Sequence, residues 1–570
     1  MANKTDRWWQ ASIGYIIYPQ SFQDSDGDGV GDLQGIISRL DYLSFLGVNL
    51  LWICPFFASP MDDNGYDVSD YLSVDPRFGT KEDFLELLEK AHARGIRIII
   101  DFVLNHTSDE HPWFQKALKD LDSEEAGYYF FRQGRRENGE LLPPNNWKGF
   151  FSTSAWENVK GTDLFYLHIF SKKMPDVNWD NPELRQRYIE IAKEYLSWGV
   201  DGFRLDAVAH LAKDLSFSDA EGEADENGLV CDTSKFSNRP ELYSYLKELH
   251  DSAFVGSNCL VVGEAGGGIR PDQAAVLADY QNGPIDMVFN FDTAWNNGAY
   301  GSIDKKDWEI RPDVLEMKRN FLKWYEECHG RCDMPLYWNN HDHPRVLSQY
   351  GSVEYRDESA KMLLSTLLFL YGTPFLFNGE EIGMSNVQYR ELSDFDDDVS
   401  SKNEIESLLK QGYEKDQILH YMRRTSRVNG HQPMQWDGSP FGGFSTKEGP
   451  VKMNPNHLEG VNVETEMKDT DSILHFYKYA IGMRKDPAIN AMVLGEFEFL
   501  DFNHPDVFAY MHRGDRDIMI VISSFRPYTT YFSFYYRISD VLLHNYDDVI
   551  LIDHVFTLRP YESFVLKVDY

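Results

Sequence analysis

The chain has 570 residues, of which 42% are hydrophobic and 26% are charged. This composition is typical of a globular protein and excludes collagen-like, disordered and small disulfide-stabilised classes. Lys and Arg total 55 against 91 Asp and Glu, so the net charge of −36 argues against nucleic acid and anionic membrane surfaces as partners and favours a neutral or cationic substrate.

Nothing in the sequence indicates export or membrane insertion. Five cysteines are scattered along the chain without the spacing of a disulfide framework or a zinc site. The first residues lack the apolar core of a secretory signal, and no run of about 18 apolar residues predicts a membrane-spanning helix. We therefore expect a soluble, cytoplasmic protein with no membrane partner.

An acidic, glycine-rich loop lies near the N-terminus. In Asp24-Ser-Asp-Gly-Asp-Gly-Val-Gly-Asp32, aspartates occupy positions 1, 3, 5 and 9, as in the first half of an EF-hand loop. Gly35 stands at position 12, where an EF-hand has its bidentate glutamate. Oxygen ligands on a tight loop suit Ca²⁺ or Mg²⁺, so we expect a structural cation site and no calcium sensor. The alternative is a solvated acidic turn.

Over the first 380 residues or so, short β-branched runs alternate with helical patterns. Thr80 and Asp83 have the spacing of a helix capping box, and the apolar run 96–103 that follows this helix is typical of a strand buried on both faces. Eight such strand candidates, separated by helical segments, predict an α/β fold with a (β/α)8 TIM barrel. They are residues 14–18, 49–54, 96–103, 202–206, 260–264, 285–290, 336–340 and 374–378.

Three stretches depart from this alternation. Residues 105–178 are rich in Asn, Trp, Gly and Pro and lack a helix period, which predicts an inserted domain after the third strand. Residues 385–470 are also irregular, and we expect them to overhang the same face. From 487 to 570, short alternating runs between turn residues predict a C-terminal antiparallel β-sandwich. The barrel would then comprise residues 1–104 and 179–486.

Acidic residues stand at or just after the ends of several candidate strands, namely Asp101, Asp206, Glu264 and Asp342. Singly, each acid would be an ordinary surface or ion-pair residue, but acids on several strand ends of one barrel converge on one pocket. A carboxylate pair is what cleavage of a glycosidic bond requires. Arg204, two residues before Asp206, would share its face of the strand and keep it ionised, whereas the apolar strand before Glu264 favours a raised pKa for that residue.

Four motifs around these acids together resemble the α-amylase superfamily, glycoside hydrolase family 13, and within it the oligo-1,6-glucosidase and α-glucosidase group. The motifs are Asp101-Phe-Val-Leu-Asn-His106, Gly202-Phe-Arg-Leu-Asp206-Ala, Gly263-Glu264-Ala and Asn340-His-Asp342. The resemblance covers essentially the whole chain. It implies the same architecture: a barrel, an inserted domain after the third strand and a C-terminal β-sandwich.

The resemblance also implies roles for individual residues. Asp206 would be the nucleophile, Glu264 the general acid/base and Asp342 the transition-state stabiliser. The other substrate-binding residues would be Asp101, His106, Arg204, Ala207, His341 and Arg427, with Asp67 holding the non-reducing end of the sugar. The acidic loop would bind its structural Ca²⁺ or Mg²⁺ through Asp24, Asp26, Asp28, Asp32 and the carbonyl of Val30, and no organic cofactor is expected.

The implied activity is that of an exo-acting, retaining α-glucosidase. It would release glucose from short maltose- or isomaltose-type oligosaccharides through a covalent glucosyl-Asp206, as a monomer or small homo-oligomer. Two alternatives share every catalytic residue: a transglucosidase or isomerase acting on sucrose or trehalose, and an isomaltose-preferring oligo-1,6-glucosidase. A phosphodisaccharide hydrolase fits the net charge less well. A non-catalytic relative is disfavoured because all three acids are present.

Three positions depart from the pattern of isomaltose-cleaving relatives. Ala207 stands where many of them have Val, and the extra room beside the leaving group favours α-1,4 linkages. Met174 stands where they have Gln, a form that goes with mixed specificity. His431 replaces an Arg that partners the residue equivalent to Asp67, so we expect an altered clamp whose binding falls as pH rises through the titration range of His431.

Overall fold

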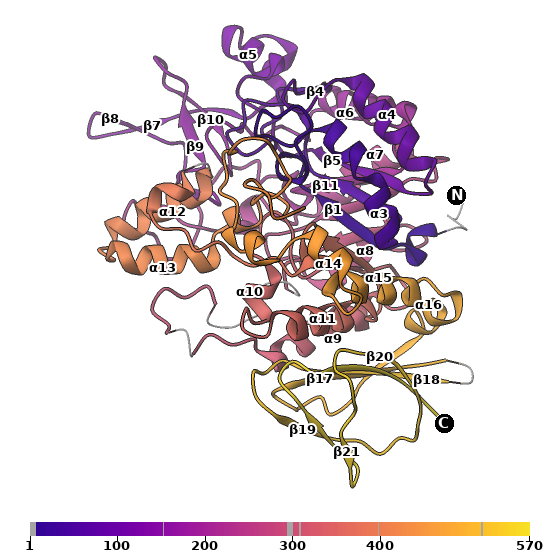
Figure 1. The fold of residues 1–570 in the computed structure, drawn as a ribbon. Coiled ribbons are helices and arrows are strands. Elements are labelled where there is room, and N and C mark those ends of the chain that lie inside the picture. Colours follow the sequence, from indigo (N-terminus) through magenta and orange to yellow (C-terminus); the bar gives the residue numbers. More distant parts are fainter. Residues whose placement is uncertain are drawn as a thin grey trace.

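The computed structural model describes residues 7–151, 153–292, 300–306, 309–396, 398–514 and 517–569. Its centre is a parallel sheet of eight strands in the order β13-β12-β11-β5-β2-β1-β15-β14 (Figure 1). The strands are β1 (Gly14–Ile17), β2 (Leu50–Ile53), β5 (Arg97–Val103), β11 (Gly202–Asp206), β12 (Leu260–Glu264), β13 (Met287–Phe289), β14 (Pro335–Leu336) and β15 (Thr373–Phe377). A parallel bridge between Met287 and Asp333 joins the two ends of the sheet, so the eight predicted strands form the predicted barrel.

Alternation along each strand explains where the polar groups lie. Leu260 and Val262 of β12 belong to the apolar cluster that fills the barrel interior, and Glu264 follows two residues later on the same face. On β5, Ile99 belongs to this cluster and Asp101 follows in the same way. The interior is therefore apolar at its N-terminal end and acidic at its C-terminal end, which is the end that carries the chemistry in such barrels.

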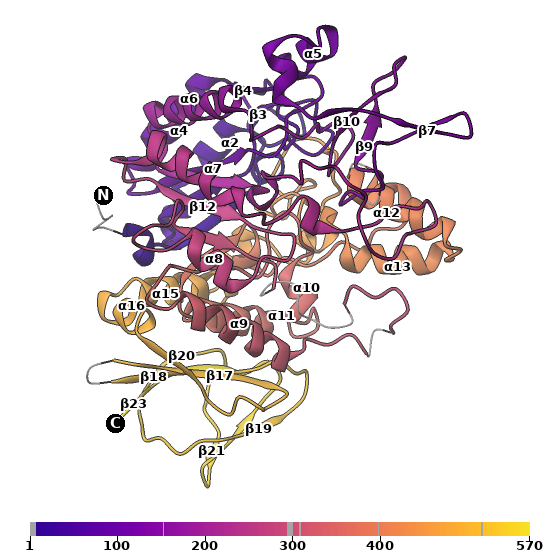
Figure 2. The ribbon, with the colours of Figure 1, turned by 180° about the vertical axis from the view of Figure 1, so that it is seen from behind.

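Helices pack around the outside of the barrel (Figures 1 and 2). In α4 (Lys81–His92), the predicted capping box is present, because Thr80 accepts from the Asp83 backbone while the Asp83 side chain accepts from the Thr80 backbone. The other helices of this layer include α2 (Leu33–Ser38), α3 (Leu40–Leu46), α6 (Pro182–Trp198), α7 (Glu241–Leu249), α8 (Pro271–Leu277), α9 (Val314–Cys328), α11 (Arg356–Leu368) and α15 (Ile473–Arg484). None of the helices in the described part of the chain is long and apolar enough to cross a membrane.

The segment after β5 forms a small antiparallel unit at the side of the barrel (Figure 1). Its strands β6 (Phe131–Gln133), β10 (Leu164–Leu167) and β9 (Trp156–Asn158) form one sheet, beside helix α5 (Pro112–Lys119) and the hairpin β7 (Arg135–Glu137) and β8 (Glu140–Leu142). Its apolar cluster includes Trp147 and Trp156 but also Val230 and Phe236, which follow β11 in the chain. Part of the loop after β11 thus packs with the insertion, while the limits 105–178 stay a prediction.

The prediction that residues 385–470 are irregular is wrong for part of the segment. Two helices, α12 (Val399–Lys410) and α13 (Lys415–Thr425), occupy its middle and lie side by side in both views (Figures 1 and 2). Ile405 and Leu408 on the first and Ile418 and Met422 on the second share an apolar cluster with Tyr389. These apolar residues recur at helical spacing, but the many charged residues between them obscured the pattern. A short helix, α14 (Val463–Lys468), follows later.

Two antiparallel sheets form the C-terminal β-sandwich. One has the order β16-β17-β18-β23-β20 and the other β19-β22-β21, and their facing apolar residues form a separate cluster. The strands are β16 (Glu496–Phe499), β17 (Val507–Arg513), β18 (Ile518–Ser524), β19 (Thr530–Ser533), β20 (Ile538–His544), β21 (Leu551–Ile552), β22 (Val555–Leu558) and β23 (Ser563–Val568). A short helix, α16 (Pro487–Val493), precedes them, and the sandwich lies beneath α9 and α11 (Figure 1).

Candidate active site

A cavity of about 400 Å³ opens at the C-terminal end of the barrel strands, and we call it the barrel cavity. Four acids line it, Asp63, Asp206, Glu264 and Asp342, together with the single arginine Arg427. The remaining described lining residues are Tyr66, His106, Phe150, Phe151, Phe170, Met174, Ala207, His210, Gly266, Gly267 and Phe291. The structure thus brings together the three predicted catalytic acids. Asp206 and Glu264 end strands β11 and β12, and Asp342 lies in the loop after β14.

One buried guanidinium joins the acids of three neighbouring strands. Arg204, 1% exposed, contacts Asp101 Oδ1 and Asp206 Oδ1 through Nη1 and Glu264 Oε1 through Nη2, each at 2.5 Å. Asp101 also accepts hydrogen bonds from Trp52 and Tyr66. Arg204 and Asp101 do not line the cavity but lie beneath it, so they position the two carboxyl groups that do.

Asp206 and Glu264 both contact Arg204, and the pKa of each is raised. Burial raises the pKa of both carboxyls, whereas Arg204 lowers it. The charge of Glu264 raises the pKa of Asp206 further, and the charge of Asp342 does the same for Glu264. The predicted rise for Glu264 is confirmed. The expectation that Arg204 keeps Asp206 ionised is incomplete. Burial raises the pKa of Asp206 more than Arg204 lowers it, so this carboxyl takes up a proton at higher pH than an isolated carboxyl does.

Asp342 lies beside Arg427 and the buried ring of His341. Its Oδ1 is 3.0 Å from Arg427 Nη1, and its Oδ2 is 3.3 Å from His341 Nε2. Burial alone would raise the pKa of Asp342, but His341, Arg427 and Arg204 lower it below its usual value. Tyr66 stacks on His341 and forms a 2.8 Å hydrogen bond with Nε2 of its ring. Asp342 is therefore an ionised carboxylate at neutral pH, unlike the Asp206–Glu264 pair.

The cavity acid near the predicted sugar clamp is Asp63 and not Asp67. Asp67 is 0% exposed and accepts hydrogen bonds from the Ser59 hydroxyl and from the backbone of Asp62 and Asp63. These bonds hold the loop together, so Asp67 does not reach the cavity. Asp63 does line it and lies 2.5 Å from Arg427 Nη2. The signal for Asp63 was the Asn-Gly turn that follows it, which predicts a tight loop but not which side chain faces inward.

Arg427, and not the residue at position 431, is the cation that pairs with Asp63. It contacts Asp63, Asp342 and Asp398, the last at 2.5 Å. His431 is 4% exposed and stacks on Tyr18 at 4.6 Å, outside the cavity wall. Burial and the charge of Arg427 lower the pKa of His431 to about 4. The expectation that His431 titrates near neutral pH is therefore wrong, since the ring is neutral well below that range.

Ala207, directly after Asp206, has an unusual backbone. Its φ of +48° lies in the left-handed region, where β-branched residues are outliers. Its N–H donates to Glu264 Oε2 at 3.2 Å, and its side chain lines the barrel cavity. The residue predicted to influence linkage therefore also contacts Glu264, the predicted general acid/base.

Aromatic residues form part of the cavity wall. Phe150, Phe151 and Phe170 come from the insertion after β5, and Met174 lies beside them in the wall. Phe150 also packs against His210 and Phe236. Of this wall, the sequence singled out only Met174, because the phenylalanines lie in an irregular segment where no periodicity shows which side chains face a cavity.

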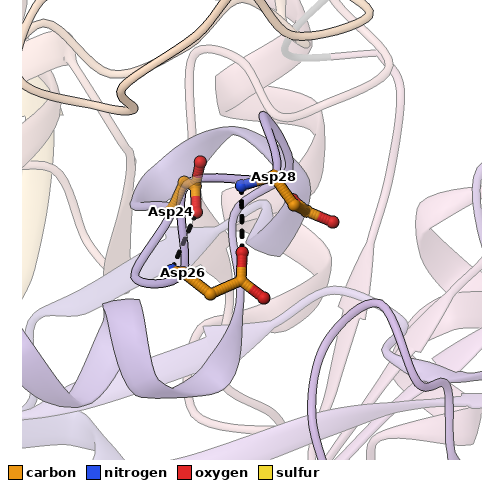
Figure 3. Close-up of side chains that lie close together, drawn as sticks. All are labelled: Asp24, Asp26 and Asp28. Atoms are coloured by element: carbon orange, nitrogen blue, oxygen red, sulfur yellow. Dashed lines mark hydrogen bonds between the residues drawn. The ribbon is translucent and has the colours of Figure 1, made fainter.

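The acidic loop brings three of its four predicted carboxylates together. Oxygen atoms of Asp24, Asp26 and Asp28 all lie within 4.8 Å of one another (Figure 3). Asp32 instead caps α2, accepting from the Gly35 backbone at 2.7 Å and from Ser25 at 2.8 Å. Carboxylate oxygens are ligands that suit Ca²⁺ and Mg²⁺, so the three clustered aspartates fit such an ion.

The contacts of Arg204 predict a large stability effect. Arg204→Met should lower the free energy of unfolding by about 3–5 kcal/mol, because three buried carboxyl groups lose their cation. Urea unfolding followed by circular dichroism measures this difference. Arg136→Gln is the matched control, since its pair with Asp163 is exposed and should contribute at most about 1 kcal/mol. An equal effect of the two substitutions would contradict the central role of Arg204.

Known proteins match both this sequence and this structure. The alpha-amylase catalytic domain family matches residues 16–492. The chain is 39% identical over 569 residues to an oligo-1,6-glucosidase of Bacillus cereus, with 99% of each chain covered. The structure of trehalose-6-phosphate hydrolase from Bacillus licheniformis is similar with a TM-score of 0.90 and 33% identity, over 99% of this chain and 100% of that one. Trehalulose synthase from Pseudomonas mesoacidophila MX-45 gives a TM-score of 0.90 and 32% identity over the same shares. The chain is therefore a glycoside hydrolase of the alpha-amylase family.

Proposed function

We propose that this enzyme is an exo-acting, retaining α-glucosidase that releases glucose from the non-reducing end of short α-glucosides, with a preference for α-1,4 linkages. The observation that carries the proposal is the pair of Asp206 and Glu264, which one arginine holds at the barrel cavity. The pair supplies the two carboxyl groups that glycosidic cleavage requires.

The pair is suited to a double displacement. An Asp206 oxygen attacks the anomeric carbon while Glu264 gives its proton to the glycosidic oxygen, so the bond to the leaving sugar breaks and a glucosyl ester forms. Water then attacks the same carbon, Glu264 takes a proton from the water, and Asp206 leaves. The double displacement requires the proton of the resting pair on Glu264, and burial and the charge of Asp342 raise the pKa of this carboxyl. Contact of both carboxylates with one guanidinium supports the short separation of about 5–5.5 Å that retention requires.

The charged wall around Arg427 supports exo-action. Arg427 ties Asp63, Asp342 and Asp398 into one charged wall. A glucose unit bound over Asp206 would meet this wall with its non-reducing end, and a longer chain could not continue past it. Asp63 and Asp342 would accept hydrogen bonds from sugar hydroxyls, while the aromatic side of the cavity would receive the leaving sugar.

The small side chain of Ala207 supports the α-1,4 preference, because it leaves room beside the leaving group. The Bacillus cereus relative is named an oligo-1,6-glucosidase, which makes isomaltose the second candidate substrate. A phosphorylated disaccharide, the substrate class in the name of the Bacillus licheniformis protein, has less support. Among the described lining residues, Arg427 is the single Lys or Arg, and its charge is already matched by carboxylates.

The proposal predicts faster glucose release from maltose than from isomaltose, with α-glucose as the first product by NMR. Ala207→Val should lower maltose turnover relative to isomaltose by about tenfold, because two added methyl groups fill the space beside the leaving sugar. Ala207→Gly is the control, since it keeps the space and the left-handed backbone and should keep the preference. Faster isomaltose turnover by the wild-type enzyme would contradict the α-1,4 preference. Turnover of neither sugar would overturn the proposal in favour of sucrose, trehalose or a phosphorylated sugar.

The activity should fall on the acid side of neutrality. Burial, opposed by Arg427, raises the pKa of Asp63 to about 6. Below this pH Asp63 gains a proton and loses its charge toward Arg427 and the sugar, so kcat/KM should decrease as pH falls through about 6. A pH profile of kcat/KM checks this. In Asp63→Asn, this limb of the profile should disappear; an unchanged limb would assign it to another group.

We further propose that the acidic loop binds one structural Ca²⁺ or Mg²⁺ through Asp24, Asp26 and Asp28, with the Val30 carbonyl and Asp32 completing or supporting the site. Removal of divalent ions with a chelator should lower the melting temperature, and added Ca²⁺ should restore it. At a concentration 100 times the dissociation constant, the ion adds about 2.7 kcal/mol to the free energy of unfolding. Asp26→Asn should abolish the calcium-dependent shift, whereas Asp122→Asn in another exposed turn should not. Equal shifts in the two variants would exclude this site.

A further inference from the structure

A buried arginine outside the barrel cavity binds the segment that carries Arg427. Arg345 is 1% exposed and lies at the end of the loop that bears Asp342, directly before helix α10 (Val346–Tyr350). It is not among the residues that line the barrel cavity. No step of the proposed double displacement uses this buried cation.

The guanidinium of Arg345 donates to main-chain carbonyl oxygens of two other segments. One acceptor directly follows strand β15, and the others come shortly after Arg427 in the chain. These acceptors are the carbonyls of Asn378, Asn429 (3.1 Å), Gly430 (3.5 Å) and Gln432 (3.4 Å). Because a planar guanidinium holds several oxygens at fixed positions, Arg345 joins three connections of the barrel at one point.

These hydrogen bonds fix the short helix that carries the arginine of the charged wall. This 3-10 helix spans Arg427–Asn429. The next residue, Gly430, packs directly on the loop that bears Asp342, because an added Cβ would lie 2.8 Å from the carbonyl oxygen of His343. The close contact keeps the short helix from moving toward the loop, and the hydrogen bonds from Arg345 keep it from moving away.

The position of the short helix determines the contacts of Arg427 in the barrel cavity. Its Nη1 lies 3.0 Å from Asp342 Oδ1, and its Nη2 lies 2.5 Å from Asp63 Oδ1. Both of these carboxyl groups line the cavity. A shift of the main chain would lengthen both contacts, and a misplacement of about 1 Å in an active site can lower the rate about 100-fold.

We propose that Arg345 is a positioning residue of the active site, which acts by holding Arg427 against Asp342 and Asp63. The charge of Arg345 is consistent with this role. Burial lowers its pKa to about 10, so the group is still a cation at neutral pH. A buried cation is costly unless it is hydrogen-bonded, and the carbonyls after Arg427 accept such hydrogen bonds.

The test is a double-mutant cycle on kcat/KM, measured with whichever of maltose, isomaltose, sucrose and trehalose the wild-type enzyme hydrolyses fastest. Arg345→Lys keeps the charge but loses the planar fork, so it should lower kcat/KM about 30-fold, mainly through a higher KM. Arg427→Lys should lower it about 100-fold. If Arg345 acts through Arg427, the double variant should be no worse than Arg427→Lys alone. Multiplied losses, about 3,000-fold in the double variant, would overturn the inference.

Arg484 provides the matched control. It is also 1% exposed and donates to two main-chain carbonyls, those of Leu368 and Gly372, each at 3.0 Å. It lies on α15, in the helical layer outside the barrel. Arg484→Lys should destabilise the fold but leave kcat/KM unchanged at temperatures well below the melting temperature. An equal loss of kcat/KM in the two lysine variants would make the effect of Arg345 a general loss of stability and overturn the inference.

Gly430→Ala keeps the test decisive if Arg345→Lys does not fold. The added methyl group meets the loop that bears Asp342 and displaces the same short helix, so its effect on kcat/KM should also vanish in the Arg427→Lys background. An effect that multiplies with that of Arg427→Lys would contradict the proposed role of this helix.

A crystal structure of Arg345→Lys gives a readout that does not depend on turnover. The guanidinium of Arg427 should lie about 1 Å or more farther from Asp342 than in the wild-type protein, and an unchanged contact would overturn the inference. The expected rise in KM rests on the proposed function, in which Asp63 and Asp342 bind the terminal glucose. Failure of the wild-type enzyme to hydrolyse any of the four sugars would refute that function alone, while the crystal structure would still decide the role of Arg345.

Discussion

The contact of one buried arginine with three carboxyl groups is the interaction on which the site depends. Asp101, Asp206 and Glu264 come from adjacent strands, and without a cation their mutual repulsion and the cost of burial would drive them apart or protonate all of them. Arg204 resolves this conflict because a planar guanidinium can hold several oxygens at fixed positions. Burial still raises the pKa of Asp206 and of Glu264, and a raised pKa is what the proposed general acid needs.

The barrel makes this contact possible. Every second side chain of a strand points into the barrel. The same face of a strand therefore carries apolar residues at its N-terminal end and an acidic residue at its C-terminal end. Loops then add what the strands cannot supply: Asp342 after β14, Asp63 before β4 (Asp70–Val74), and Arg427 from the segment after α13. The proposed nucleophile and acid/base thus sit at the ends of strands, while Asp342 and the groups proposed to determine chain length lie on the connections.

This division also explains which features could be predicted from the sequence. The eight strands, Arg204 and the acids at the strand ends follow from local periodicity and from motif residues adjacent to buried runs. Asp63 could not be distinguished from Asp67, because both lie in one loop. Only the hydrogen bonds that Asp67 accepts from Ser59 and from the backbone of Asp62 and Asp63 show that Asp67 points away from the cavity. The state of His431 also required the structure, since its pKa depends on burial and on Arg427. Helices α12 and α13 were missed because their apolar residues are few and separated by charges.

The packing of the insertion has a consequence for how such an enzyme can change. The aromatic part of the cavity wall packs on an apolar cluster formed by the insertion together with the loop after β11. This cluster is distinct from the one in the barrel interior. Substitutions in that cluster would alter this part of the cavity wall, while the strands that hold Arg204 and its carboxyl groups rest on the other cluster. Ala207 is different, because it directly follows Asp206 and its N–H donates to Glu264. During evolution, mutations in the insertion would change which sugars bind, while the destabilisation that they cause would stay within the insertion.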